Sequence, residues 1–440
     1  MMRSLYSGVA GLKTHQTRMD VIGNNIANVN TTAYKSQSMT FSDLMYQTTQ
    51  AASGANPTTG VGGTNARQIG LGAKTSAIKT AITTQGASQT TNDPFDIMIT
   101  GDSFFIVNNG QNNYFTRDGS FYVDGAGNLA MTSTGYNVMG WQVDPNDASA
   151  IKQDTVSALR VMTTENMTYP PEATKSARIS GIIDKNDTNV NATAGKIMNL
   201  EFYDNQGYKY TAKLSVHSTK TDGQFTVKLD DILDSKGKTV LADPTKASLQ
   251  QNNADVKDPV LEFDLKNGSF KNVGTAGGKE STLTLHFDTG TFPSFTDITI
   301  DFSKCSNLNN NGSSTVSPIR GDAKGNGAGR KVGEMSGIEI QKDGMIYANY
   351  DNGCSRLLGQ IAVATFANAS GLAKEGDNLY SATQNSGDFD GIGTDITTGG
   401  GYMNTGVLEM SNVDLSSEFT EMITTQRGFQ ANSRIITVSD

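Results

Sequence analysis

The sequence LEMSNVDLSSEFTEMITTQRGFQANSRIITVSD occupies residues 408–440 and places an apolar side chain at every seventh position, with one more between two of them. A repeat of seven keeps one apolar seam of a helix turned toward a partner helix. We therefore predict a helix over 404–440 that packs against another helix. Its seam residues are Leu408, Leu415, Phe419, Met422, Phe429 and Ile436.

The beginning of the chain carries the same pattern, which predicts a second helix within residues 1–33. Ser4 is the expected N-cap of this helix, and Ser411 or Asn412 that of the C-terminal one. We expect a coiled coil, formed by the two helices together or with copies of the chain. The repeat still runs at Asp440, so we expect the natural helix to continue. The N-terminal seam residues are Leu5, Val9, Leu12, Met19 and Ile26.

Composition predicts a large, mainly β protein. A chain of 440 residues exceeds the size of one hydrophobic core, and its 47 glycines and short alternating apolar runs are typical of strands and turns.

The net charge of −9 argues against nucleic acid or an anionic membrane as the main partner. No apolar run approaches the ~20 residues that cross a bilayer, so no membrane insertion is expected. Arg3 and His15 interrupt any secretory signal, so we expect no cleaved leader.

The arrangement of strand-like and turn-like segments predicts nested, discontinuous β domains between the terminal helices. Met198, Leu200 and Phe202 alternate with polar residues, as in a strand with one buried face. Two connections that suit hinges flank the region of clearest alternation, one stiffened by proline and one rich in glycine. The predicted hinge residues are Pro170, Pro171, Gly325, Gly327 and Gly329. The predicted domains are a helical domain of 1–33 and 404–440, an extended connector of 34–73, an inner β domain of 74–162 and 331–403, and an inserted outer β domain of 163–330.

Residues that carry chemistry are sparse, so we predict no enzyme, no cofactor and no metal. The histidines are His15, His217 and His286, and two imidazoles on neighbouring strands without a third ligand make a weak metal site. The chain has no HExxH, GxSxG or P-loop motif. Cys305 and Cys354 are expected to be free thiols, because a disulfide framework needs more cysteines.

Several stretches together resemble the bacterial flagellar axial family, which contains the rod and hook proteins. GNNIANVNTTAYKS at 23–36 resembles the N-terminal signature of that family, and 408–440 resembles the C-terminal one. GDSFFIV at 101–107 and FTRDGSF at 115–121 resemble its conserved β-hairpin region. These matches cover about half of the chain.

The long central insertion makes the chain more similar to the hook members of this family than to its shorter rod members. LLGQIAVATFANASGLAKEGDNLYSATQNSG at 357–387 also resembles the returning inner β domain of hook proteins. A distal rod protein is the first alternative. An adhesin-like binding module is the second, and it would require a ligand-selective pocket within 163–330.

The resemblance implies a self-assembling structural subunit of a curved, flexible tube that joins rod to filament and transmits torque. It implies export through the flagellar type III apparatus, an extracellular location in the hook, and contacts with rod, hook cap and hook–filament junction proteins. It also marks a group of asparagines, either as a helix C-cap and turn or as donors of hydrogen bonds between subunits. These are Asn24, Asn25, Asn28 and Asn30.

Overall fold

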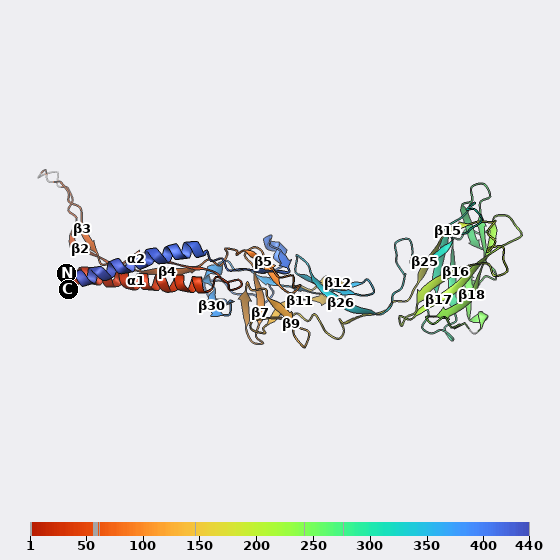
Figure 1. Ribbon diagram of the computed structural model, residues 1–440, viewed down its shortest axis with the longest axis horizontal. Coiled ribbons are helices and arrows are strands. Elements are labelled where there is room, and N and C mark those ends of the chain that lie inside the picture. Colours follow the sequence, from red (N-terminus) through yellow and green to blue (C-terminus); the bar gives the residue numbers. More distant parts are fainter. Residues whose placement is uncertain are drawn as a thin grey trace. The chain divides into compact units, whose positions relative to one another are not determined.

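The computed structural model in Figure 1 describes residues 2–55, 60, 62–145, 147–241, 243–275 and 277–439. The fold class is as predicted, because the described residues are mainly strands, with long helices near both termini. The chain divides into two compact units. The first unit is Met1–Asn166, Gly337–Asn349 and Ser355–Asp440, and the second unit is Met167–Ser336 and Tyr350–Cys354.

The terminal helices are α1, Met2–Ala27, and α2, Leu415–Ser439, so both helices differ at their starts from the prediction. Ser4 lies inside α1 and does not cap it. The N-cap of α2 is Asp414, whose Oδ1 accepts a hydrogen bond of 2.9 Å from the Ser416 amide, rather than Ser411 or Asn412. The residues before this cap form strands β32, Met403–Thr405, and β33, Val407–Glu409.

The segment between α1 and the inner sheet folds into two antiparallel ribbons. β1, Gln37–Asp43, pairs with β4, Ala73–Thr80, and β2, Tyr46–Gln50, pairs with β3, Arg67–Gly70. The first ribbon packs on α1, because the rings of His15 and Phe41 meet edge to face with centroids 5.6 Å apart. The predicted connector is therefore paired backbone along most of its described length.

The core of the first unit is a sheet in which β28, β11, β7, β8 and β31 are successive neighbours. Trp141 and Phe104 lie in its centre and are almost completely buried. The strands of this region are β5 Ser88–Thr90, β6 Ile97–Ile99, β7 Phe104–Asn108, β8 Asn113–Thr116, β9 Phe121–Val123, β10 Leu129–Met131, β11 Asn137–Asp144, β12 Asp147–Ile151, β13 Ser157–Ala158, β27 Met345–Tyr350, β28 Ser355–Ile361, β29 Val363–Ala364, β30 Ala373–Gly376 and β31 Leu379–Ser381.

The second unit has its own core between a six-stranded and a five-stranded sheet. Met198, Leu200 and Phe202 are buried on one face of β16, as their alternation predicts. The strands are β14 Thr168–Tyr169, β15 Ser176–Ile183, β16 Lys196–Tyr203, β17 Lys209–Ser218, β18 Gln224–Asp234, β19 Ala247–Gln251, β20 Ala254–Asp255, β21 Val260–Phe263, β22 Phe270–Gly274, β23 Thr282–Phe287, β24 Ile298–Asn307 and β25 Ser317–Arg320, with β26 Gly333–Ile340 continuing into the first unit.

Candidate assembly interface

The helices α1 and α2 lie side by side and antiparallel, with the two chain ends at the same end of the pair (Figure 1). As the contacting residues advance along α1, their partners come earlier in the sequence of α2. In order, these contacts are Gly11 with Asn432, His15 with Gly428, Arg18 with Glu421 and Asn25 with Glu418. A terminal helix pair forms, mainly through small and polar side chains.

Most of the predicted apolar seam lies beside this contact, although Ile436 reaches it, because its Cγ1 lies 3.5 Å from the Cβ position of Gly8. Met19 directly follows Arg18 in the sequence, and Phe419 directly follows Glu418, so each seam residue sits about 100° around its helix from a contact residue. The seam is partly open: Val9 and Phe419 are each 50% exposed, whereas Met19, Met422 and Phe429 are half-buried. Of the two predicted pairings, within one chain or with copies of the chain, most of the seam residues are thus left for the second, which stays a prediction.

The two apolar stripes nevertheless lie on the same side of the helix pair. In both helices, the stripe residues directly follow the contact residues, so the stripe is rotated from the contact in the same sense about each helix axis. Because the two helices run antiparallel, these rotations bring both stripes to the same side of the pair. The β1–β4 ribbon covers the other side of α1, where Thr14 and Val21 are buried. The stripe residues on the open side, called here the apolar face, are Leu5, Val9, Leu12, Met19 and Ile26 of α1 with Leu415, Phe419, Met422, Phe429 and Ile436 of α2.

Leu408 is the one predicted seam residue that lies outside both helices. It belongs to β33, where it pairs with Gln89 of β5. The next residue, Glu409, is fully buried and accepts a hydrogen bond of 2.6 Å from the Lys35 ammonium, which also donates to the Thr84 carbonyl. Burial lowers the pKa of Lys35, and the Glu409 carboxylate opposes that shift. This ion pair fixes the chain before α2 to the chain after α1.

The contact between the helices buries polar groups without full compensation. His15 Nδ1, Glu418 Oε2 and Thr425 Oγ1 are buried without a hydrogen-bond partner. Burial lowers the pKa of His15, with a smaller contribution from the Arg18 charge, and burial raises the pKa of Glu418. Such a contact specifies how the helices align more than it stabilises them.

The predicted asparagine motif acts largely within the chain. Asn25 is buried, accepts a hydrogen bond of 2.9 Å from the Gln37 amide and donates one to Glu418, so its amide is used internally. The side chain of Asn24 donates to the Tyr34 hydroxyl, and Asn28 donates to the Asn24 carbonyl at the end of α1. Asn30 is exposed. Of these residues, Asn28 bonds the end of α1, whereas Asn25 joins α1 to Gln37 and to α2.

The predicted hinge residues lie within the second unit, and Gly327 and Gly329 are closely packed. A side chain added at Gly327 would meet Ser176, and one added at Gly329 would meet Thr174. The Lys175 amide donates a hydrogen bond of 2.9 Å to the Gly327 carbonyl. Gly325 has open space around it. Pro171 contacts the turn at Gly207, and Pro170 directly precedes Pro171 in the sequence.

The histidines give no shared site. His217 lies on β17 and His286 on β23, which belong to different sheets, so the two rings are not neighbours across one sheet. Within the described ranges, no group of three His, Cys, Asp or Glu side chains is placed to hold a metal ion. Cys305 and Cys354 are both free. No helix in the described part of the chain is long and apolar enough to span a membrane.

Comparison with known proteins finds flagellar families at both ends and in the inner β region. The model for flagella basal body rod proteins matches residues 5–35, that for the flagellar hook protein FlgE/F/G D1 domain matches 98–180, and that for the flagellar basal body rod FlgEFG protein C-terminal matches 404–440.

Similar curated proteins extend over the full chain. The flagellar hook protein FlgE of Borreliella burgdorferi is 37% identical and that of Treponema pallidum 34%, and each alignment covers 100% of this chain and 98% of the relative. The flagellar basal-body rod protein FlgG of Bacillus subtilis is 29% identical over 100% of this chain and 96% of its own length.

Proposed function

Because this chain belongs to the flagellar hook protein family, we propose that it is the structural subunit of the bacterial flagellar hook. Copies of the chain assemble into a curved, flexible tube that joins the rod to the filament and transmits torque. The subunit acts by its shape and its contacts, not as an enzyme.

The observation that supports this function is the apolar face of the helix pair. A monomeric protein rarely leaves a long apolar surface in water, and a heptad repeat is made to receive another helix. Leu415 is 39% exposed and Phe419 is 50% exposed, although both continue a regular heptad pattern. The occupant that fits this surface is the same surface, or a neighbouring helix, of further copies. Burying one such side chain contributes roughly 1.5–3 kcal/mol.

Location and partners follow from the hook assignment. The subunit is part of the extracellular hook and is exported through the flagellar type III apparatus without a cleaved signal. The ends of the tube meet rod and hook–filament junction proteins, and a hook cap protein covers the growing tip.

The test compares two neighbouring positions of α2. Phe419→Asp places a charge on the apolar face, whereas Thr420→Asp places the same charge about 100° away on an exposed position. Purified monomers of both variants should keep the helix signal of the parent chain. Only Phe419→Asp should fail to form tubes, measured by sedimentation and electron microscopy. Equal assembly of both variants, or equal failure, would show that the apolar face is not the polymerisation surface.

The similarity to FlgG keeps a distal rod protein as the second candidate. Deleting the gene in the source bacterium and imaging basal bodies separates the two. Complete rods that end without hooks support the hook, whereas rods that stop short support the rod assignment. Intact flagella would contradict both.

A further inference from the structure

The glycine-rich loop at 325–330 lies wholly within the second unit and has an alternating backbone. Gly325, Gly327 and Gly329 have φ angles of 86°, 70° and 67°, and the residues between them do not have positive φ. Alternation of this kind is typical of a nest, a concavity of successive backbone N–H groups that binds anions. The loop therefore has the local conformation of an anion site.

The carbonyl groups of the loop bind the chain that enters β15. The Asn326 carbonyl accepts a hydrogen bond of 2.6 Å from the Ser176 hydroxyl, and the Gly327 carbonyl accepts one of 3.1 Å from the Ser176 amide. The Ala328 carbonyl accepts one of 3.0 Å from the Thr174 hydroxyl. Each of these peptides is trans, so the N–H that follows each carbonyl points in the opposite direction, away from that chain.

The amides of Gly327 and Gly329 have no internal acceptor. Neither N–H has a hydrogen-bond partner among the residues that the structure describes. A cavity of about 410 Å³ lies beside the loop, lined by 325–330 together with Glu172, Asn352 and Cys354. Backbone N–H groups are strong donors that nearly always find a partner. These two groups are thus available to a ligand in the cavity.

The first half of the same loop already binds a carboxylate. Oδ1 of Asp322 accepts hydrogen bonds of 2.9 Å from the Asn326 amide and 2.8 Å from the Lys324 amide. These bonds hold the pKa of Asp322 below its usual value, because they favour the charged carboxylate. The second half repeats the alternation at Gly327 and Gly329, but no carboxylate of the described chain bonds to those amides. An external oxyanion would complete the same arrangement there.

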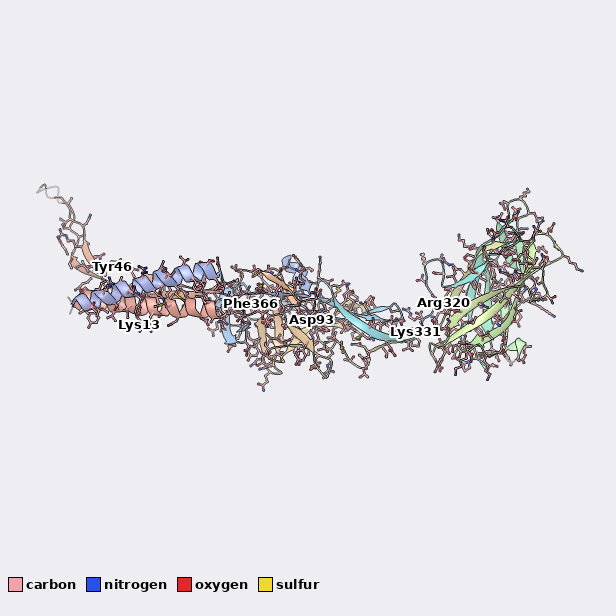
Figure 2. The ribbon with its side chains drawn as sticks, viewed as in Figure 1. Lys13, Tyr46, Asp93, Arg320, Lys331 and Phe366 are labelled. Atoms are coloured by element: carbon pink, nitrogen blue, oxygen red, sulfur yellow. The ribbon has the colours of Figure 1, made fainter. Side chains whose placement is uncertain are left out.

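The charges around the cavity nearly balance. Nε of Arg330 donates a hydrogen bond of 3.1 Å to the Glu172 carboxylate, Nη2 donates to the same carboxylate, and Nη1 donates to the Cys354 thiol at 2.6 Å. A guanidinium has five N–H groups, so two remain for a ligand. Lys331, labelled in Figure 2, lies 2.6 Å from the Asp351 carboxylate and does not line the cavity. Binding of an anion therefore depends on the backbone amides, with Arg330 in support.

We propose that the amides of Gly327 and Gly329, with Arg330 beside them, form a binding site for an oxyanion, either a carboxylate or a phosphate group. Hydrogen bonds from N–H groups to a charged oxygen are shorter and stronger than those to a neutral acceptor. The source of the oxyanion is either the medium around the protein or an acidic side chain of a second copy. Only the second source rests on the proposed hook function.

The first test is a titration of the full chain, labelled with ¹⁵N at glycine, with sodium phosphate. Sodium chloride of equal ionic strength is the reference. The amide signals of Gly327 and Gly329 should shift and saturate in phosphate alone. Those of Gly321 and Gly325 should stay in place, because their amides already donate to backbone carbonyls. A shift of all four signals alike, or one that does not saturate, would overturn the site.

The variant Glu172→Gln tests the location of the anion. It removes the negative charge that lines the cavity and leaves a side-chain oxygen that accepts from Arg330. Phosphate should bind about fivefold more tightly, because a like charge nearby no longer repels it. The matched control Glu201→Gln removes a similarly exposed carboxylate of the same unit, paired with Lys209, and should leave binding unchanged. Equal affinity of the two variants would overturn the site.

A third measurement identifies the source of the oxyanion. If an acidic side chain of a second copy fills the site, saturating phosphate should slow tube growth, followed by light scattering, relative to sodium chloride of equal ionic strength. Growth at the same rate, with phosphate still bound, would assign the site to an oxyanion from the medium. If the parent chain forms no tubes, the hook function fails, and the glycine titration still decides whether the site exists.

Discussion

Asp118 shows what a single residue contributes in this chain. The Asp118-Gly119 pair forms a tight turn, and its glycine is required because an added Cβ would lie 1.6 Å from the Ile97 carbonyl oxygen. The turn buries the aspartate, whose Oδ1 accepts a hydrogen bond of 3.2 Å from the Ser120 amide. Burial, with a smaller contribution from Asp96, raises the pKa of Asp118 to about 6.

This shift predicts a pH-dependent effect of Asp118→Asn. The folded state binds the proton more tightly than the unfolded state, so the cost of the buried charge is present above pH 6 and disappears as the pH falls toward 3.8. The amide keeps an acceptor for Ser120 and carries no charge. We expect the variant to be about 2–3 kcal/mol more stable than the parent at pH 7 and nearly equal to it near pH 4.

Urea unfolding followed by fluorescence measures this difference, because Trp141, the single tryptophan, is buried in the same sheet region. A loss of stability of the same size at both pH values would contradict the assignment. It would mean that the carboxylate is needed for the turn.

At the scale of elements, the contact between α1 and α2 and the proposed contact with other copies use different stripes of the helices. The heptad pattern suggested one seam for both. The stripe toward the partner helix in the same chain contains Gly11, His15, Gly428 and other small or polar residues, which allow close approach. The apolar stripe next to it is only partly covered. The seven-residue periodicity identified both helices. It did not show which stripe of each helix contacts the other helix, because the contacting stripe is mostly polar and carries no hydrophobic pattern.

Glycine substitutions in the helices should have opposite effects that depend on this geometry. A Cβ at Gly428 would lie 2.7 Å from His15 Cε1, whereas Gly23 has no atom within 4 Å of that position. Gly428→Ala should therefore destabilise the helix pair by about 1–2 kcal/mol. Gly23→Ala should stabilise α1 by about 0.5–1 kcal/mol, since alanine favours helix interiors.

Urea titration of the helix signal in circular dichroism checks both changes. Stabilisation by both substitutions would mean that helix propensity alone decides and that α1 and α2 do not pack at His15 and Gly428 in solution.

At the scale of the whole molecule, two compact units with separate cores share one chain. The first unit contains both termini and the apolar face, and the second contains two sheets packed around their own core. The proposed assembly face therefore belongs to the first unit alone.

The charge of the whole subunit predicts how assembly depends on salt. Subunits with a net charge of −9 repel one another, and salt shortens the range of that repulsion from ~30 Å at about 0.01 M to ~10 Å at about 0.1 M. The apolar contacts are not weakened by this screening. We expect tube formation, followed by light scattering, to become faster over that range. Slower assembly with added salt would indicate that ion pairs, rather than the apolar face, drive polymerisation.

The sequence by itself determined the local and repetitive features of this protein. Heptad spacing predicted α1 and α2, alternation predicted β16, and the motif at 23–36 predicted the family that the comparisons show. Each of these signals is carried by residues close together in the chain. They needed no knowledge of distant contacts.

Only the tertiary structure decided features that join distant residues. The pairing of Lys35 with Glu409 and the place of Leu408 in a strand both depend on segments that meet only after folding. The orientation of the apolar face also depends on which neighbours cover α1. Burial and pairing are properties of the assembled chain, because they are set by contacts across hundreds of residues and not by local periodicity.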